Sequence, residues 1–188
     1  MSLVTRTLAL LEGNTQDRIA YVRQAYRRNP RQMTMLLARE LDLPEVMIVR
    51  SMPDDISVEL DAVRWEALLR SLEAVGRVHV IVSNAATTIE SVGSFGGFSQ
   101  GGGFFNVQSG SLDMHIRHAA LASVFAVRKP SHLDGHATLS IQFFDLQGTA
   151  AFKIFLTFGG SEPSPDKEAE FERLISDFRI EAPEVSLQ

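Results

Sequence analysis

The stretch that decides the fold is residues 101–160, GGGFFNVQSGSLDMHIRHAALASVFAVRKPSHLDGHATLSIQFFDLQGTAAFKIFLTFGG. Apolar and polar residues alternate along it with a period of two, which is typical of half-buried strands. The pattern predicts strands over 104–108, 112–118, 120–128, 136–144 and 150–158. Because the turns between them are short, we expect an antiparallel meander.

Two further strands are predicted before this stretch. Valines at positions 78, 80 and 82 start an alternating run at residue 77, and a second strand follows over 88–92 after a turn at Ser83 and Asn84. Residues 93–103 contain six glycines. We expect this segment to end the strand pairing, and whether it forms a mobile lid is left open.

The first third of the chain has the 3.6-residue periodicity of helices. It predicts helices over about 14–28, 30–40, 44–50 and 65–75, with Asn14 or Thr15 capping the first and Asn29 before Pro30 opening the second. Residues 51–57 are expected to be a loop, and Ser164 begins a last helix over about 165–178. The fold class is therefore α+β in one domain, residues 1–188: a helical part at about 14–76, a large antiparallel sheet at about 77–158 and a C-terminal helix.

The alternation also assigns sheet faces. In 136–144, Leu139 and Ile141 point to the core, and the intervening residues make the opposite face polar. In 112–118, one face carries Asp113, His115 and Arg117. An imidazole between an acid and a guanidinium is compatible with a small-molecule site, but a solvated strand face is the more usual arrangement of such residues.

Composition excludes several classes. The chain has 188 residues, no cysteine and a formal net charge of -5, so disulfides, thiolate chemistry and a general attraction to nucleic acid or anionic membranes are not expected. No apolar run is long enough to span a bilayer, the N-terminal run is too short for a signal peptide, and we expect a cytoplasmic protein. Phosphate-loop, nucleophile-elbow and zinc-protease motifs are missing from the sequence.

Two histidine pairs and a helical hairpin suggest other functions. His115 and His118 fall on opposite faces of a strand, which disfavours a metal clip, whereas His132 and His136 flank a turn and could meet. The predicted helices 30–40 and 44–50 have the size of a helix-turn-helix unit. The first sixty residues contain eight arginines but also eight acids, so DNA or protein binding through these helices remains an alternative.

Several motifs, taken together, resemble one protein family. The segments are LARELDLPEVMIVRSMPDD, RWEALLRSLEAVGRVHVIVSNAATTIE, GGGFFNV, HIRHAALASVFAVRKP and HATLSIQFFDLQGTAAFKIF, and the resemblance around them runs from about residue 18 to residue 158. Their order is similar to that in the bacterial haem-utilisation proteins of the HutX/ChuX type. It also resembles a single repeat of the two-repeat HemS/ChuS haem-trafficking proteins.

The resemblance implies an α+β fold, a homodimer, and haem binding for storage or transfer inside the cell. His115 matches a family histidine put forward as a haem contact and is the candidate metal ligand, while Phe104 and Phe105 match a neighbouring aromatic segment. Arg117 and Arg128 are the candidates for pairing with the propionates, because arginine offers a bidentate fork to a carboxylate. Ser83 stands where some family members carry a second histidine.

The resulting hypothesis is a non-enzymatic, cytoplasmic haem-binding protein. A different tetrapyrrole with carboxylates would suit the same arginines. An enzyme that opens or reduces the tetrapyrrole is the alternative from another class.

Overall fold

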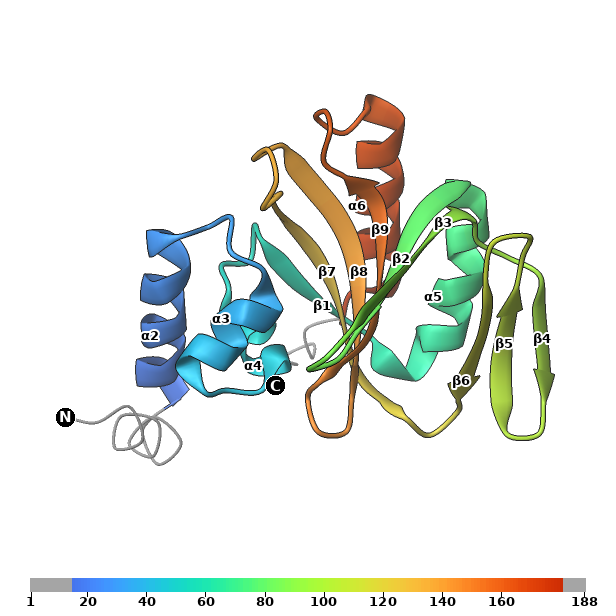
Figure 1. Ribbon diagram of the computed structural model, residues 1–188, viewed down its shortest axis with the longest axis horizontal. Coiled ribbons are helices and arrows are strands. Elements are labelled where there is room, and N and C mark those ends of the chain that lie inside the picture. Colours follow the sequence, from blue (N-terminus) through green and yellow to red (C-terminus); the bar gives the residue numbers. More distant parts are fainter. Residues whose placement is uncertain (1–14, 181–188) are drawn as a thin grey trace, which may run out of the picture.

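The computed structural model describes residues 15–180, and its centre is a six-stranded antiparallel sheet with the order β1-β7-β8-β9-β2-β3 (Figure 1). A second, three-stranded sheet has the order β4-β5-β6. The strands are β1 Ser57–Leu60, β2 Arg77–Ser83, β3 Thr88–Ser94, β4 Phe98–Gly101, β5 Phe104–Gln108, β6 Asp113–Arg117, β7 Leu121–Pro130, β8 Ala137–Asp145 and β9 Ala150–Phe158.

The predicted fold class is confirmed, but the strands divide between two sheets. The division falls just after β6, where the amide of Ala120 donates to the carbonyl of Arg117 at 3.1 Å and turns the chain into β7. The segments β4–β6 and β7–β9 are each meanders of short antiparallel connections. Residues 118–120 therefore separate two sheets that the alternation alone would join.

The helices cover both faces of the large sheet (Figure 1). On one face lie α2 Thr15–Arg28, α3 Thr34–Leu41 and α4 Glu45–Ser51. On the other lie α5 Trp65–Ser71, which follows the 3-10 turn Ala62–Arg64 and continues as a second such turn Leu72–Val75, and α6 Pro165–Phe178. The small sheet extends beyond α5 on that second side. None of these helices, within residues 15–180, is long and hydrophobic enough to cross a bilayer.

Two of the predicted helix starts illustrate how local signals set the beginning of a helix. The helix expected from Pro30 begins at Thr34 with Met33 as its N-cap, because the amide of Gln32 donates to the carbonyl of Asn29 and closes a turn first. In the last helix Ser164 accepts from the amide of Lys167, as predicted. The Asn14 cap of the first helix lies outside the described residues.

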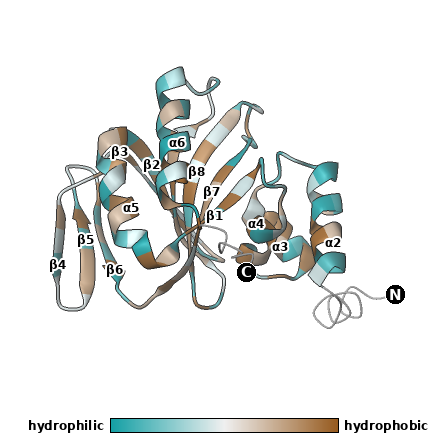
Figure 2. Ribbon diagram, turned by 180° about the vertical axis from the view of Figure 1, so that it is seen from behind, coloured by the Kyte–Doolittle hydropathy of each residue, from teal (hydrophilic) through white to brown (hydrophobic). Residues whose placement is uncertain are grey.

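The main core lies between the large sheet, α5, α6 and the inner face of the small sheet. The ring of Trp65 meets that of Phe105 edge to face at 5.4 Å, and Phe143 stacks on Phe152 at 4.5 Å. Figure 2 shows hydrophobic residues recurring along β7 and β8, whereas α2 and α6 carry more hydrophilic stretches. Burial of these side chains from water is the principal stabilising contribution.

The opposite face of the large sheet is also covered. Val46 and Val49 of α4 pack on Phe125, Val127 and Phe144. In β8 the predicted alternation is confirmed, since Leu139, Ile141 and Phe143 lie in the main core. The polar residues between them, Thr138, Ser140 and Gln142, are nevertheless buried, so the polar face lies beneath the N-terminal helices instead of in solvent.

The glycine-rich segment is built into both sheets. Gly93 pairs with Val78 in the β2–β3 ladder, and residues 98–101 form β4. The expectation that this segment ends the pairing is therefore wrong. Gly97 has a φ of 69°, and an added Cβ would lie 1.9 Å from the carbonyl oxygen of Gln108, so glycine alone lets the chain pass β5 this closely.

Candidate ligand-binding site

A cavity of about 750 Å³ lies between α3 and the face of the large sheet that α2, α3 and α4 cover. Met35 and Arg39 of α3 line it, together with Met33, which directly precedes that helix. The floor comes from β7, β8, β9, β2 and β3, and His132 contributes from the turn between β7 and β8. Its volume is within the range of sites that enclose a small organic ligand.

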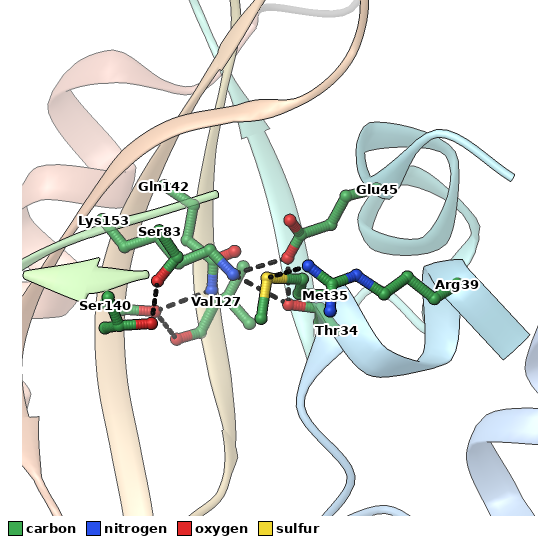
Figure 3. A network of polar contacts seen from close by, with 10 residues as sticks. Thr34, Met35, Arg39, Glu45, Ser83, Val127, Ser140, Gln142 and Lys153 are labelled. Atoms are coloured by element: carbon green, nitrogen blue, oxygen red, sulfur yellow. Dashed lines mark hydrogen bonds and ion pairs between the residues drawn. The ribbon is translucent and has the colours of Figure 1, made fainter. Parts of the chain in front are cut away.

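The floor of the cavity contains an ordered chain of hydrogen bonds (Figure 3). The hydroxyl of Ser140 donates to the carbonyl of Val127 at 3.3 Å, and the amide nitrogen of Gln142 donates to the Ser140 hydroxyl at 3.1 Å. This order leaves the amide oxygen of Gln142 as an acceptor, and it has no partner among the described residues. Gln142 is only 3% exposed, so an oxygen that accepts no hydrogen bond there lowers the stability of the fold.

Lys153 of β9 connects the floor to the helices above it. Its ammonium group donates to the Thr34 hydroxyl at 3.0 Å and forms an ion pair with Glu45 at 2.5 Å (Figure 3). Thr34 in turn donates to Glu45 at 2.6 Å. Glu45 is 7% exposed, so its charge and that of Lys153 neutralise each other in a dry environment.

Lys129 of β7 is the second lysine on this floor, and it has no such partner. Its ammonium group donates to the carbonyl of Pro130 at 2.8 Å, and no carboxylate within residues 15–180 forms an ion pair with it. Burial, together with the nearby charge of Lys153, lowers the pKa of Lys129 from 10.5 to about 8. The floor therefore carries one uncompensated positive charge at neutral pH.

One wall of the cavity is aromatic. Phe155 and Phe158 of β9 meet edge to face at 4.9 Å, and the imidazole of His79 lies 4.1 Å from the ring of Phe158. The His79 ring is held by Glu90 at 2.9 Å. The two phenylalanine rings, together with Ile81, Met33 and Met35, give the cavity an apolar surface beside its charged residues.

His132 is the exposed histidine at the cavity rim. Every other histidine side chain binds a polar neighbour: His79 binds Glu90, His115 binds Asn106, His118 binds Glu66 and His136 binds Glu162. His118 and His136 therefore each contact a glutamate and not another histidine. Within residues 15–180 no cluster of three or more histidines and acids has the geometry of a metal site.

Three of the residues predicted as haem contacts share an exposed face of the small sheet. The Nδ1 atom of His115 lies 2.7 Å from the amide oxygen of Asn106, and its ring meets that of Phe104 edge to face at 6.2 Å. The guanidinium of Arg117 lies 5.3 Å from the centre of the same Phe104 ring. This face belongs to β5 and β6, on the side of the molecule away from α3 and the cavity (Figure 1).

The structure separates the other two predicted residues from this face. Phe105 follows Phe104 in β5 and so points the opposite way, where it is fully buried against Trp65. Arg128 lies in β7 and forms ion pairs with Glu168 at 2.6 Å and Glu172 at 2.8 Å, which join the sheet to α6. Phe105 and Arg128 thus act in packing, and neither lies beside His115.

Apart from His132, which was considered only as a partner for His136, the cavity residues were missed by sequence reasoning, although two weak signals exist. Lys153 is the one charged residue in the apolar run AAFKIFLTF, and Lys129 follows Arg128 in a strand, so that the two cations face opposite sides. Gln142 was placed on the polar face of β8, but nothing in the sequence shows that helices cover that face.

A helical layer over an antiparallel sheet, with a partly apolar cavity between them, defines an α+β protein with room for a small ligand between its layers. Residues 58–174 match the family described as Haem utilisation ChuX/HutX, and the chain belongs to this family.

Its relatives agree in sequence and in fold. The chain is 26% identical over 152 residues to the intracellular heme transport protein HutX of Vibrio cholerae, covering 80% of this chain and 78% of HutX. The crystal structure of ChuX superposes with a TM-score of 0.74 at 20% identity, over 83% of this chain and 96% of ChuX. The heme-binding protein PhuS of Pseudomonas aeruginosa matches with a TM-score of 0.69 at 21% identity, over 87% of this chain but 46% of PhuS, as expected for a single repeat.

Proposed function

We propose that this protein binds haem inside the cell and stores it or transfers it to another protein. The observation that carries the proposal is the cavity, because it combines an aromatic wall with a cationic floor in a member of the ChuX/HutX family. A macrocycle with propionates needs apolar contact, cations and an iron ligand. HutX, a relative over most of its length, is an intracellular heme transport protein.

The residues of the cavity fit these three needs. Phe155, Phe158 and Met35 supply apolar contact to the ring. Lys129 supplies a positive charge with unused donors, and Arg39 lies nearer the opening. His132 supplies an imidazole at the rim, where it has no competing hydrogen-bond partner in the described part of the chain.

His115 is the second candidate for the iron ligand. Its ring lies beside the exposed Phe104 and within the same sheet face as Arg117, which is an arrangement of imidazole, apolar surface and cation. Because this face lies across the molecule from the cavity, the two histidines define two distinct sites. Variants of each histidine can therefore show which of the two sites binds the iron.

We further propose a cytoplasmic homodimer with no role in binding nucleic acid. At the edge of the large sheet β3 leaves one side unpaired, with Ile89 and Val92 exposed, and such edges favour pairing with a second copy. Several N-terminal arginines hold the fold together: Arg23 and Arg31 donate to backbone carbonyls, and Arg50 pairs with Glu59. Sedimentation of a strict monomer would remove the dimer from the proposal.

Titration of the purified protein with haemin tests the function. We expect a saturable shift of the Soret band at micromolar haemin, with the band altered in His132→Ala and unchanged in His115→Ala. The reverse result assigns the ligand to His115 and the small sheet. No shift in the unmodified protein contradicts haem binding. Addition of a reductant to the complex and the appearance of biliverdin-like absorbance would indicate the enzymatic alternative.

A further inference from the structure

We infer that Arg31 is a positioning residue for His132: its guanidinium fastens the turn between β7 and β8 to the helical layer and so holds the imidazole at the rim of the cavity. The inference rests on the proposed function for the role of His132 as an iron ligand. It adds the residue that fixes this ligand, and with it a control on how firmly bound haem is held.

The guanidinium of Arg31 binds three successive carbonyl groups of the turn. Its Nε atom donates to the carbonyl of Ser131 at 3.2 Å, and its Nη2 atom donates to those of His132 at 3.3 Å and Leu133 at 2.8 Å. Arg31 itself lies in the connection between α2 and α3. Because a guanidinium is planar and its N–H bonds point in fixed directions, three acceptors set both the place and the orientation of the turn backbone.

The turn also has a backbone shape that admits this group. Gly135 has a φ of 86°, and a Cβ added to it would lie 3.7 Å from the guanidinium carbon of Arg31. The amide of Gly135 donates to the carbonyl of Ser131 at 3.1 Å, and the amide of Ser131 donates to that of His136 at 2.8 Å. Arg31 therefore packs on the backbone of a turn that closes on itself.

A second set of contacts ties the other half of the turn to the connection between β9 and α6. Asp134 accepts from the amide of Gly160 at 2.5 Å and from the amide of His136 at 3.1 Å. The Nδ1 atom of His136 lies 3.0 Å from a carboxylate oxygen of Glu162. The half of the turn that carries the rim histidine is thus the half that the guanidinium holds.

The position of His132 depends on this backbone contact. Its side chain is exposed, and within residues 15–180 its imidazole has no hydrogen-bond partner. Groups that orient a metal ligand without touching the metal typically change metal affinity by about tenfold to a hundredfold. Among the described residues that line the cavity Arg31 is absent, so an effect of its removal on haem would pass through the turn.

Amide hydrogen exchange in the ligand-free protein tests the contact without haem. In Arg31→Met, exchange at the amides of Ser131 and Gly135 should become about tenfold faster, which corresponds to about 1.4 kcal/mol. Arg28→Met is the matched control, since it removes one positive charge from the exposed end of α2, and it should leave both rates unchanged. Unchanged rates in Arg31→Met overturn the inference.

The rate of haem release tests whether Arg31 acts through His132. With excess apomyoglobin as the acceptor, Arg31→Met should release haem about tenfold faster than the unmodified protein and should show an altered Soret band. In a His132→Ala background the same substitution should change the rate by less than about twofold, because the group that it positions is gone. Arg31→Lys keeps the charge without the fork of donors and should resemble Arg31→Met.

The outcomes separate this inference from haem binding itself. A release rate that is unchanged in Arg31→Met and Arg31→Lys, or an equal acceleration with and without the His132 imidazole, overturns the positioning role and leaves haem binding intact. No Soret shift in the unmodified protein contradicts haem binding alone. The exchange rates then decide whether Arg31 holds the backbone of His132, in variants with native circular dichroism.

Discussion

Replacement of Lys129 by methionine should make the ligand-free protein more stable. The ammonium group of Lys129 is partly buried without an acid partner, and its pKa falls from 10.5 in water to about 8 in the folded chain. A difference of this size corresponds to about 3 kcal/mol of destabilisation at neutral pH. Methionine removes the charge, keeps the length of the side chain and loses one hydrogen bond to Pro130, so the net gain should be about 1–3 kcal/mol.

The pH dependence follows from the same shift. Between pH 8 and 10.5 the unfolded state binds more protons at Lys129 than the folded state does, so this residue makes stability rise with pH across that interval. Below pH 8 its penalty is fully present, and above 10.5 the penalty is absent. In Lys129→Met this contribution to the slope should vanish.

Urea denaturation of the ligand-free protein and the variant, at pH 7 and at intervals up to pH 10, measures both effects. We expect Lys129→Met to have the higher midpoint at pH 7 and the two curves to converge as the pH rises. Lys153→Met is the contrasting variant, because it leaves Glu45 buried without its cation and should destabilise the protein. A Lys129→Met protein that is less stable than the parent at pH 7, with an unchanged slope, would refute the reasoning.

Three other variants test separate parts of the structure. Glu45→Gln should lower the unfolding free energy by about 3 kcal/mol, because it leaves Lys153 without its buried partner. Thermal melting measures this loss, and an unchanged melting temperature would mean that the ion pair contributes nothing to stability. Gly97→Ala should destabilise by more than about 1 kcal/mol, since it combines a φ of 69° with a clash against the carbonyl of Gln108, whereas Gly101→Ala, which meets no neighbour, is the control. Arg128→Met should leave haemin affinity within about twofold, because its guanidinium is paired with Glu168 and Glu172, and a large loss of affinity would contradict the packing role.

Local patterns were sufficient for the elements with strong periodicity. The C-terminal helix was predicted over 165–178 and is Pro165–Phe178, because Ser164 and Pro165 form a distinct start signal. The strands Phe104–Gln108 and Ala150–Phe158 were likewise predicted at the residues where they occur. In each case the signal lies within the element or at the residue directly before it.

Elements and contacts that depend on distant residues could not be predicted in this way. The four-residue β1 exists because it pairs with β7, with Leu60 opposite Val124, and its own sequence resembles a loop end. The cavity arises where α3 lies over the polar face of β8, and no local pattern specifies that contact. The resemblance directed attention to His115, while the buried charge of Lys129 became visible only when burial and partners were known.

Haemin titration of the unmodified protein beside Lys129→Met and His132→Ala is the most direct test that haem binds in the cavity. We predict a Soret shift at micromolar haemin in the unmodified protein, a weaker affinity in Lys129→Met and an altered band in His132→Ala. Identical affinities and spectra in all three proteins would contradict a cavity site, and no Soret shift in any of them would contradict haem binding itself.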